Sequence, residues 1–95
     1  MKVHWTETAR DHLRGIHAYI AKNSPQYALR MVDRLTRRSQ QIADFPLSGR
    51  EVKEFGIPQI REVLEAPFRI IYYIKPDQID VLAVIHGARQ IPPTQ

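Results

Sequence analysis

Two neighbouring runs of sequence decide the fold: FRIIYYIK at residues 68–75 and IDVLAVIH at residues 79–86, with Pro76-Asp77-Gln78 between them. Both runs are rich in β-branched and aromatic residues, which favour strands, and both are too short for a buried helix. The Pro-Asp pair between them is typical of a turn. The sequence therefore predicts an antiparallel hairpin over residues 68–86.

The register of this hairpin determines which side chains are buried. If Ile74 pairs with Ile79, strict alternation places one set of apolar side chains on a single face: Phe68, Ile70, Tyr72, Ile74, Ile79, Val81, Ala83 and Ile85. A shift of one residue would bring Arg69 among them, so burial favours the first register. We therefore expect Arg69 and His86 to lie together on the other face, among Ile71, Tyr73, Lys75, Asp80, Leu82 and Val84.

The composition limits the class of protein. A chain of 95 residues, 43% apolar and 25% charged, is ordinary for one small globular domain, so we assign residues 1–95 to a single domain. The absence of cysteine excludes disulfides, thiolate zinc sites and cysteine nucleophiles. No apolar run approaches the roughly 18 residues of a membrane span, and the N-terminus lacks the apolar stretch of a secretory signal. We therefore expect a cytoplasmic protein.

The formal charge of +4 is unevenly distributed along the chain. Lys and Arg outnumber Asp and Glu by eight to three in residues 1–43, whereas the counts are six and seven in residues 44–95. Such an excess suits an acidic partner, for example a nucleic acid, the ribosome or an acidic protein segment. A solvated basic surface without a partner is the alternative.

The first half of the chain predicts a short strand followed by two helices. Val3 and Trp5 alternate with polar residues, and Thr6 follows as the N-cap of a helix that ends near Asn23. Ser24-Pro25 is a second helix start, and this helix continues to about Ala43. The apolar stripes of the two helices consist of Ala9, Leu13, Ile16 and Ile20, and of Ala28, Val32, Leu35 and Ile42.

The second half of the chain predicts strands. Residues 45–50 are expected to form a loop, Gly56 and Pro58 keep the next segment irregular, and residues 60–65 form a strand before the hairpin. The tail, residues 91–95, contains two prolines and is expected to be frayed. The order β-α-α-β-β-β predicts an α+β fold, a small antiparallel sheet with a two-helix hairpin packed on one face.

Seven short motifs follow this order of elements along nearly the whole chain. They are Trp5-Thr6, Tyr19-Ile20-Ala21, Pro25 with Ala28, Phe45-Pro46-x-x-Gly49-Arg50, Arg61-Glu62, Phe68-Arg69-Ile70-x-Tyr72 and Val84-x-His86-x-x-Arg89. Together they resemble the ParE/RelE superfamily of toxins from type II toxin-antitoxin systems. The resemblance implies a toxin neutralised by a protein antitoxin, and it implies one of two targets: DNA gyrase, as for ParE proteins, or messenger RNA on the ribosome, as for RelE proteins.

Glu54, Arg69 and His86 resemble the catalytic set of one subgroup of the nucleases. A metal-free ribonuclease must activate the ribose 2′-OH, stabilise the phosphate and protonate the leaving oxygen, roles that suit Glu, Arg and His. Against this, Leu64-Glu65 stands where RelE nucleases place a basic residue, and no tyrosine follows His86. These departures favour a ParE-like, non-enzymatic inhibitor of DNA gyrase. A ribosome-dependent mRNA endonuclease and an inactive family member are the alternatives.

Further side chains are candidates for contact with the antitoxin or the target: Arg30, Arg34, Arg37, Arg38, Arg61, Ile71, Leu82, Val84 and Arg89. The spacing of the first four places them on one helix stripe, and the apolar members would form an exposed patch on the open face of the hairpin.

Structural roles compete with these assignments. Arg69 could pair with Glu62 or Glu65 on the adjacent strand, and His86 could bond to a neighbouring carbonyl. His12 and His17 are five residues apart, which does not place two ligands on one helix face, so we expect neither a metal nor a cofactor. The only partners expected are the antitoxin, in a hetero-oligomer, and the target.

Overall fold

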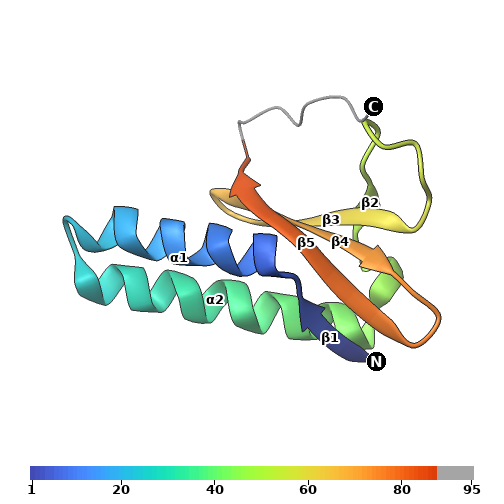
Figure 1. The fold of residues 1–95 in the computed structure, drawn as a ribbon, viewed down its shortest axis with the longest axis horizontal. Coiled ribbons are helices and arrows are strands. Elements are labelled where there is room, and N and C mark those ends of the chain that lie inside the picture. Colours follow the sequence, from blue (N-terminus) through green and yellow to red (C-terminus); the bar gives the residue numbers. More distant parts are fainter. Residues whose placement is uncertain (88–95) are drawn as a thin grey trace.

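In the computed structural model, which describes residues 1–87, two helices cover one face of a five-stranded sheet (Figure 1). The helices are α1 (Glu7–Ala21) and α2 (Pro25–Asp44), followed by a short 3-10 turn, η1 (Pro46–Ser48). The strands are β1 (Lys2–Trp5), β2 (Arg50–Glu51), β3 (Ile60–Glu65), β4 (Phe68–Ile74) and β5 (Gln78–His86). The predicted α+β fold and its order of main elements are confirmed.

The sheet differs from the prediction in two respects. Its strand order is β1-β5-β4-β3-β2, and β1 runs parallel to β5, so the sheet is mixed and not purely antiparallel. A parallel pair needs a long crossover connection, and here the two helices and the strands after them supply it. The second difference is β2, which pairs with Arg61 and Glu62 in a region expected to be a loop.

Both predicted helix starts are confirmed by their caps. Thr6 Oγ1 accepts a hydrogen bond from the N–H of Ala9 at 3.2 Å, and Ser24 Oγ accepts from the N–H of Tyr27 at 3.1 Å. The buried stripe of α2 differs from the predicted one at two places: Met31 is fully buried whereas Val32 is only half-buried, and Ser39 is buried as well. The main core lies between the helices and the sheet and consists of Ala9, Met31, Leu35, Ile42, Val63, Ile70, Tyr72, Ile79, Val81 and Val84.

A second, smaller cluster lies on the sheet face opposite the helices. Val52, in the connection between β2 and β3, covers Ile60 and Ile71, with Phe55, Leu82, Ala83 and Ile85 packed around them. This connection therefore closes part of the face that the sequence left open.

A β-bulge in β5 determines the faces of the hairpin. Ile74 pairs with Ile79, as predicted, and Tyr72 pairs with Val81, but Ile71 pairs with Ala83, so Leu82 has no partner in β4. A bulge of one residue reverses the alternation beyond it. The placement of Ala83 and Ile85 on the helix face was therefore wrong, and Val84 is in the main core instead.

Tyr72 explains the spacing of the Phe45-Pro46-x-x-Gly49-Arg50 motif. Its hydroxyl donates to the carbonyl oxygen of Pro46 at 2.6 Å and accepts from the N–H of Gly49 at 3.1 Å. A Cβ atom at Gly49 would lie 2.4 Å from that hydroxyl, so only glycine permits this approach. Burial raises the pKa of Tyr72, against a smaller lowering effect of the hydrogen bond from Gly49.

Candidate functional site

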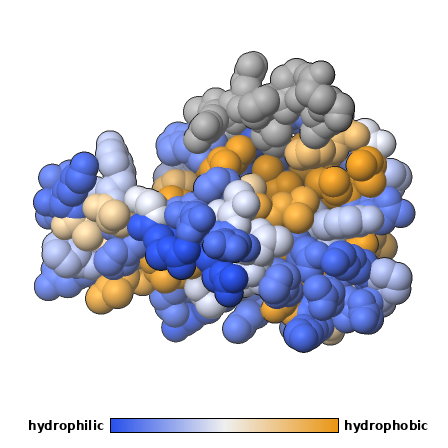
Figure 2. Space-filling model, in the orientation of Figure 1, coloured by the Kyte–Doolittle hydropathy of each residue, from blue (hydrophilic) through white to orange (hydrophobic). Residues whose placement is uncertain are grey.

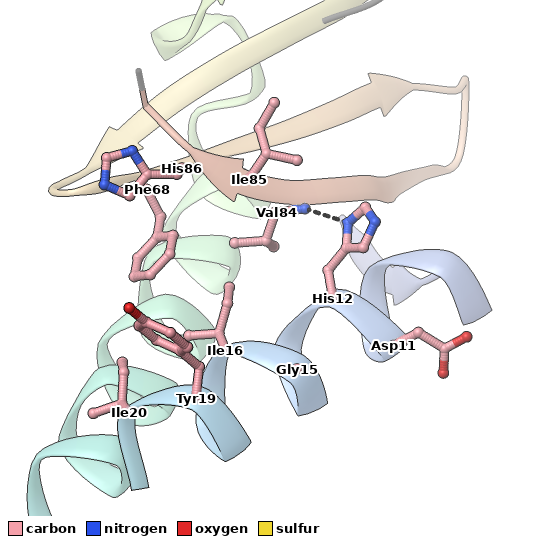
Figure 3. Close-up of a pocket in the computed structure, with 10 residues that line it drawn as sticks. All are labelled: Asp11, His12, Gly15, Ile16, Tyr19, Ile20, Phe68, Val84, Ile85 and His86. Atoms are coloured by element: carbon pink, nitrogen blue, oxygen red, sulfur yellow. Dashed lines mark hydrogen bonds between the residues drawn. The ribbon is translucent and has the colours of Figure 1, made fainter. Parts of the chain in front are cut away.

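The candidate site is an apolar groove of about 430 Å³ between α1 and the end of the hairpin (Figure 3). The first helix contributes one side of the groove, β4 contributes a single aromatic ring, and the end of β5 contributes the rest. The lining residues are Asp11, His12, Gly15, Ile16, Tyr19, Ile20, Phe68, Val84, Ile85 and His86. The ionisable residues Asp11 and His86 belong to different walls, one on the helix and one on the strand.

Four residues give this groove its character. Tyr19 is 74% exposed although it is large and aromatic, so it presents apolar surface to solvent. The Phe68 ring meets the imidazole of His86 edge-on, with ring centroids 6.0 Å apart. Gly15 has open space where a Cβ would lie, so the absent side chain widens the groove at the middle of α1.

A polar cavity of about 300 Å³ lies on the opposite face of the sheet, against the second cluster. Glu62 is 5% exposed and is held between two guanidinium groups, with its Oε1 2.7 Å from Nη1 of Arg69 and its Oε2 2.7 Å from Nε of Arg50. Glu51, Lys53 and Glu54 complete the lining. Positive and negative side chains are equal in number there, so the cavity has no excess charge to attract an anion.

The structure does not bring the predicted catalytic residues together. Glu54 and Arg69 line the polar cavity, whereas His86 lines the groove on the helix side. The expectation that Arg69 and His86 share a face was wrong, because the bulge at Leu82 reverses the end of β5. The structural alternative for Arg69 is confirmed, since this residue is 8% exposed and pairs with Glu62.

The arginines of α2 form contacts of their own. Arg34 binds Glu65 at 2.7 Å and joins α2 to the end of β3, and Arg37 binds Asp33 at 3.0 Å on the same helix. Arg38 bonds to the side-chain oxygen of Gln41 at 3.3 Å, and the guanidinium of Arg30 lies 5.8 Å from the ring centroid of Tyr27. The stripe is exposed for the most part, but part of its charge is neutralised.

The other candidate contact residues are placed as follows. Arg61 Nη1 donates to the carbonyl oxygen of Gly49 at 2.9 Å. Ile71 and Val84 are each 3% exposed, so the expectation that they form an exposed patch was wrong. Leu82, the bulge residue, is half-buried. Arg89 and the tail at residues 91–95 lie outside the described residues.

The sequence reasoning missed the groove. His12, Ile16 and Tyr19 are spaced i, i+4 and i+7 on α1, which places them on one stripe beside the buried Ala9. This spacing, together with a glycine in mid-helix, was the available signal.

In Figure 2 apolar side chains reach the surface near β5, above a largely hydrophilic surface over the helices.

Residues 1–87 contain neither a metal-binding cluster nor a membrane-spanning helix. No three His, Asp or Glu side chains in this part of the chain are close enough to hold a metal ion. No helix there combines the length and the apolar content needed to cross a bilayer.

Comparison with known proteins agrees with this fold. The family model described as ParE toxin of type II toxin-antitoxin system, parDE, matches residues 3–91. The toxin candidate Y4kP of Sinorhizobium fredii is 36% identical over 93 residues, which cover 96% of this chain and 93% of that protein. Toxin RelE2 of Caulobacter vibrioides is 33% identical over 89 residues, covering 93% and 97%.

A solved structure shares the architecture. The chain from a structure of the chromosomal ParDE system of P. aeruginosa superposes with a TM-score of 0.74 at 24% identity, covering 90% of this chain and 95% of that one. At this identity the likeness concerns the fold alone, whereas the family match extends over nearly the whole sequence. The chain therefore belongs to the ParE toxin family and is the toxin component of a type II toxin-antitoxin system.

Proposed function

We propose that this toxin acts by binding DNA gyrase and does not cleave RNA. The observation that supports this is the separation of the would-be catalytic groups, with Glu54 and Arg69 on one face of the sheet and His86 on the other. General acid and base groups must come within about 2.6 to 3.2 Å of the atoms they serve. Side chains on opposite faces of one sheet do not converge on a single phosphate.

The state of Arg69 supports the same proposal. A phosphate-stabilising arginine needs free donors directed at the phosphate oxygens. Here one donor of Arg69 is occupied by the buried carboxylate of Glu62, which also repels an incoming phosphate. The candidates for target contact are then surfaces and not catalytic groups: the arginine stripe of α2 and the C-terminal segment with Arg89, which lies outside the described residues.

Two assays with purified components test this proposal. We expect the toxin to inhibit supercoiling by gyrase in a dose-dependent manner and to leave messenger RNA intact on translating ribosomes, and we expect the cognate antitoxin to restore supercoiling. Cleavage of messenger RNA by the toxin, with gyrase unaffected, would overturn the proposal.

We also propose that the cognate antitoxin of this ParE family member places an apolar segment in the groove between α1 and β5. The groove offers apolar side chains from three elements: Tyr19 from α1, Phe68 from β4 and Ile85 from β5 are examples. Exposed apolar surface rimmed by polar groups is typical of a partner site. The open face of the hairpin, the earlier candidate, is less accessible because the connection between β2 and β3 covers Ile71.

A matched pair of helix variants tests the docking site. Tyr19→Asp places a charge in the groove, and we expect antitoxin binding to weaken at least tenfold because a large aromatic anchor is lost. Leu29→Asp is the control, since Leu29 is 63% exposed on α2 and does not line the groove. Leu82→Asp probes the open face. A loss of affinity with Leu82→Asp and none with Tyr19→Asp would indicate that the antitoxin binds the open face and not the groove.

A further inference from the structure

Where β1 ends, two side chains complete the edge of β5: Thr6, the N-cap of α1, and His12 within that helix. Trp5, the last residue of β1, pairs with Val81. Directly after it, Thr6 Oγ1 donates to the carbonyl oxygen of Val81 at 2.8 Å. Further along the same strand, the backbone N–H of Val84 donates to Nδ1 of His12 at 3.2 Å, as the dashed line in Figure 3 shows. His12 thus supplies the acceptor that a neighbouring strand would otherwise provide.

This hydrogen bond requires one protonation state of His12. An imidazole nitrogen accepts a hydrogen bond only when it carries no proton, so the ring must be neutral with its proton on Nε2. An imidazolium has N–H groups at both nitrogens and would direct Nδ1–H against the N–H of Val84. Protonation of His12 and the bond to Val84 therefore exclude each other.

The position of the bond makes it important for the groove. Val84 lies two residues beyond the bulge at Leu82 and beyond Val81, the last residue of β5 that pairs with β1, so His12 bonds to β5 where β1 no longer does. His12 and Val84 both line the groove, so their bond joins its two walls.

Few other ionisable groups line the groove beside His12. The remaining ionisable groups that line the groove are Asp11 and Tyr19 from α1 and His86 from β5. Asp11 is ion-paired with Arg14 on the same helix. β4 contributes only Phe68, and no residue of α2 or β1 belongs to the lining found among the described residues.

We propose that His12 is a positioning residue that acts as a protonation-sensitive latch. In its neutral form it fixes α1 to the bulged segment of β5 and holds the two walls of the groove together. In its protonated form it releases the N–H of Val84, and the groove loosens.

Amide hydrogen exchange measured by NMR tests the latch. The protection factor is the suitable quantity, because it corrects for the pH dependence of intrinsic exchange. We expect the protection of Val84 to fall roughly tenfold on acidification from about pH 8 to about pH 5. At the higher pH, the nitrogen chemical shifts of His12 should report the form with the proton on Nε2.

Three variants separate the latch from a purely structural role. His12→Asn keeps an acceptor near the place of Nδ1 but does not titrate, so Val84 should stay protected at both pH values. His12→Ala should lose the protection at both. His17→Asn changes the other histidine of α1, which does not line the groove, and should behave like the unmodified protein. Protection that is independent of pH in the unmodified protein, or equally dependent on pH in His12→Asn, would overturn the proposal.

The latch also predicts how antitoxin binding depends on pH, and this step rests on the proposed docking in the groove. Affinity should fall on acidification in the unmodified toxin and fall less in His12→Asn. If Val84 protection follows the latch while the affinity does not differ between these two proteins, the antitoxin binds elsewhere and the latch stands. If both the protection and the affinity are independent of pH, the latch itself is refuted.

Discussion

Glu62 shows how a single residue can determine the role of its neighbours. Its buried carboxylate joins Arg69 and Arg50, each at 2.7 Å. Removing one member of a buried ion pair leaves the other charge without compensation and typically costs about 3 to 5 kcal/mol. An Arg69 variant could therefore lose toxicity because its fold is destabilised and not because a catalytic group is missing. The free energy of unfolding of such a variant must be measured together with its toxicity.

Tyr72 allows a sharper prediction at the same scale. Tyr72→Phe removes the hydroxyl that bonds to Pro46 and Gly49, so the half-buried carbonyl of Pro46 and the buried N–H of Gly49 both lose this hydrogen bond. We expect the free energy of unfolding to fall by about 1 to 3 kcal/mol, measured by urea denaturation. Tyr73→Phe is the control, because Tyr73 is 37% exposed. Equal effects of the two variants would contradict the role of the Tyr72 hydroxyl.

The same hydroxyl predicts a response to alkaline pH. Burial raises the pKa of Tyr72 above the ordinary tyrosine value of 10.0, so folding favours the neutral phenol. The resulting stabilisation is complete below about pH 10 and is lost as the pH rises through the pKa of the folded state. We expect the unmodified protein to lose more stability than Tyr72→Phe between about pH 9 and about pH 11. Parallel pH profiles of the two proteins would contradict this.

Among the elements, β5 was predicted correctly only in its first half, up to the bulge at Leu82. The turn residues and the alternation fixed the pairing of Ile74 with Ile79 correctly. The bulge at Leu82 left no trace in the sequence, because residues 81–85 are all apolar and either arrangement of faces buries apolar side chains. The error propagated to the site, since it placed His86 beside Arg69 and placed Val84 on the open face.

The glycine inside the first helix allows a prediction about stability. Gly15 lies inside α1, and a Cβ there would meet no atom within 4 Å. Gly15→Ala should therefore raise the free energy of unfolding by about 0.5 to 1 kcal/mol through helix propensity. Gly49→Ala is the contrasting variant and should destabilise, because its Cβ would lie 2.6 Å from the backbone oxygen of Glu62. A destabilised Gly15→Ala would show that this stretch of α1 is not a regular, open helix.

At the scale of the whole molecule, the sequence predicted local structure better than relations between distant segments. The caps at Thr6 and Ser24 and the strand at residues 60–65 follow from local chemistry and are confirmed. The parallel pairing of β1 with β5 and the cover over Ile71 join segments far apart in the chain, for which alternation and turn residues give no information. The groove was missed for the same reason, because its walls come from α1 and the end of the hairpin.

The separation of the two faces also predicts the behaviour of the toxin in cells. His86→Ala should retain growth arrest at least in part, because a toxin that acts through contact needs no proton transfer from this residue. Growth after induction without antitoxin is the measurement, with the amount of soluble protein as the control. Complete loss of toxicity at an unchanged protein level, together with loss of ribosomal mRNA cleavage, would favour the nuclease.

The bulge has a consequence for comparing this chain with its relatives. If Leu82 alone were deleted, β5 would run as a regular strand, and Val81, Val84 and His86 would keep their present faces. If the strand kept its length and lost the bulge, the faces beyond Val81 would exchange and His86 would lie beside Arg69. The presence or absence of the bulge therefore determines whether His86 and Arg69 lie on the same face of the sheet. Two sequences that share every motif residue can differ in this respect. An alignment of this family is informative about function only when the gap at this position is placed correctly.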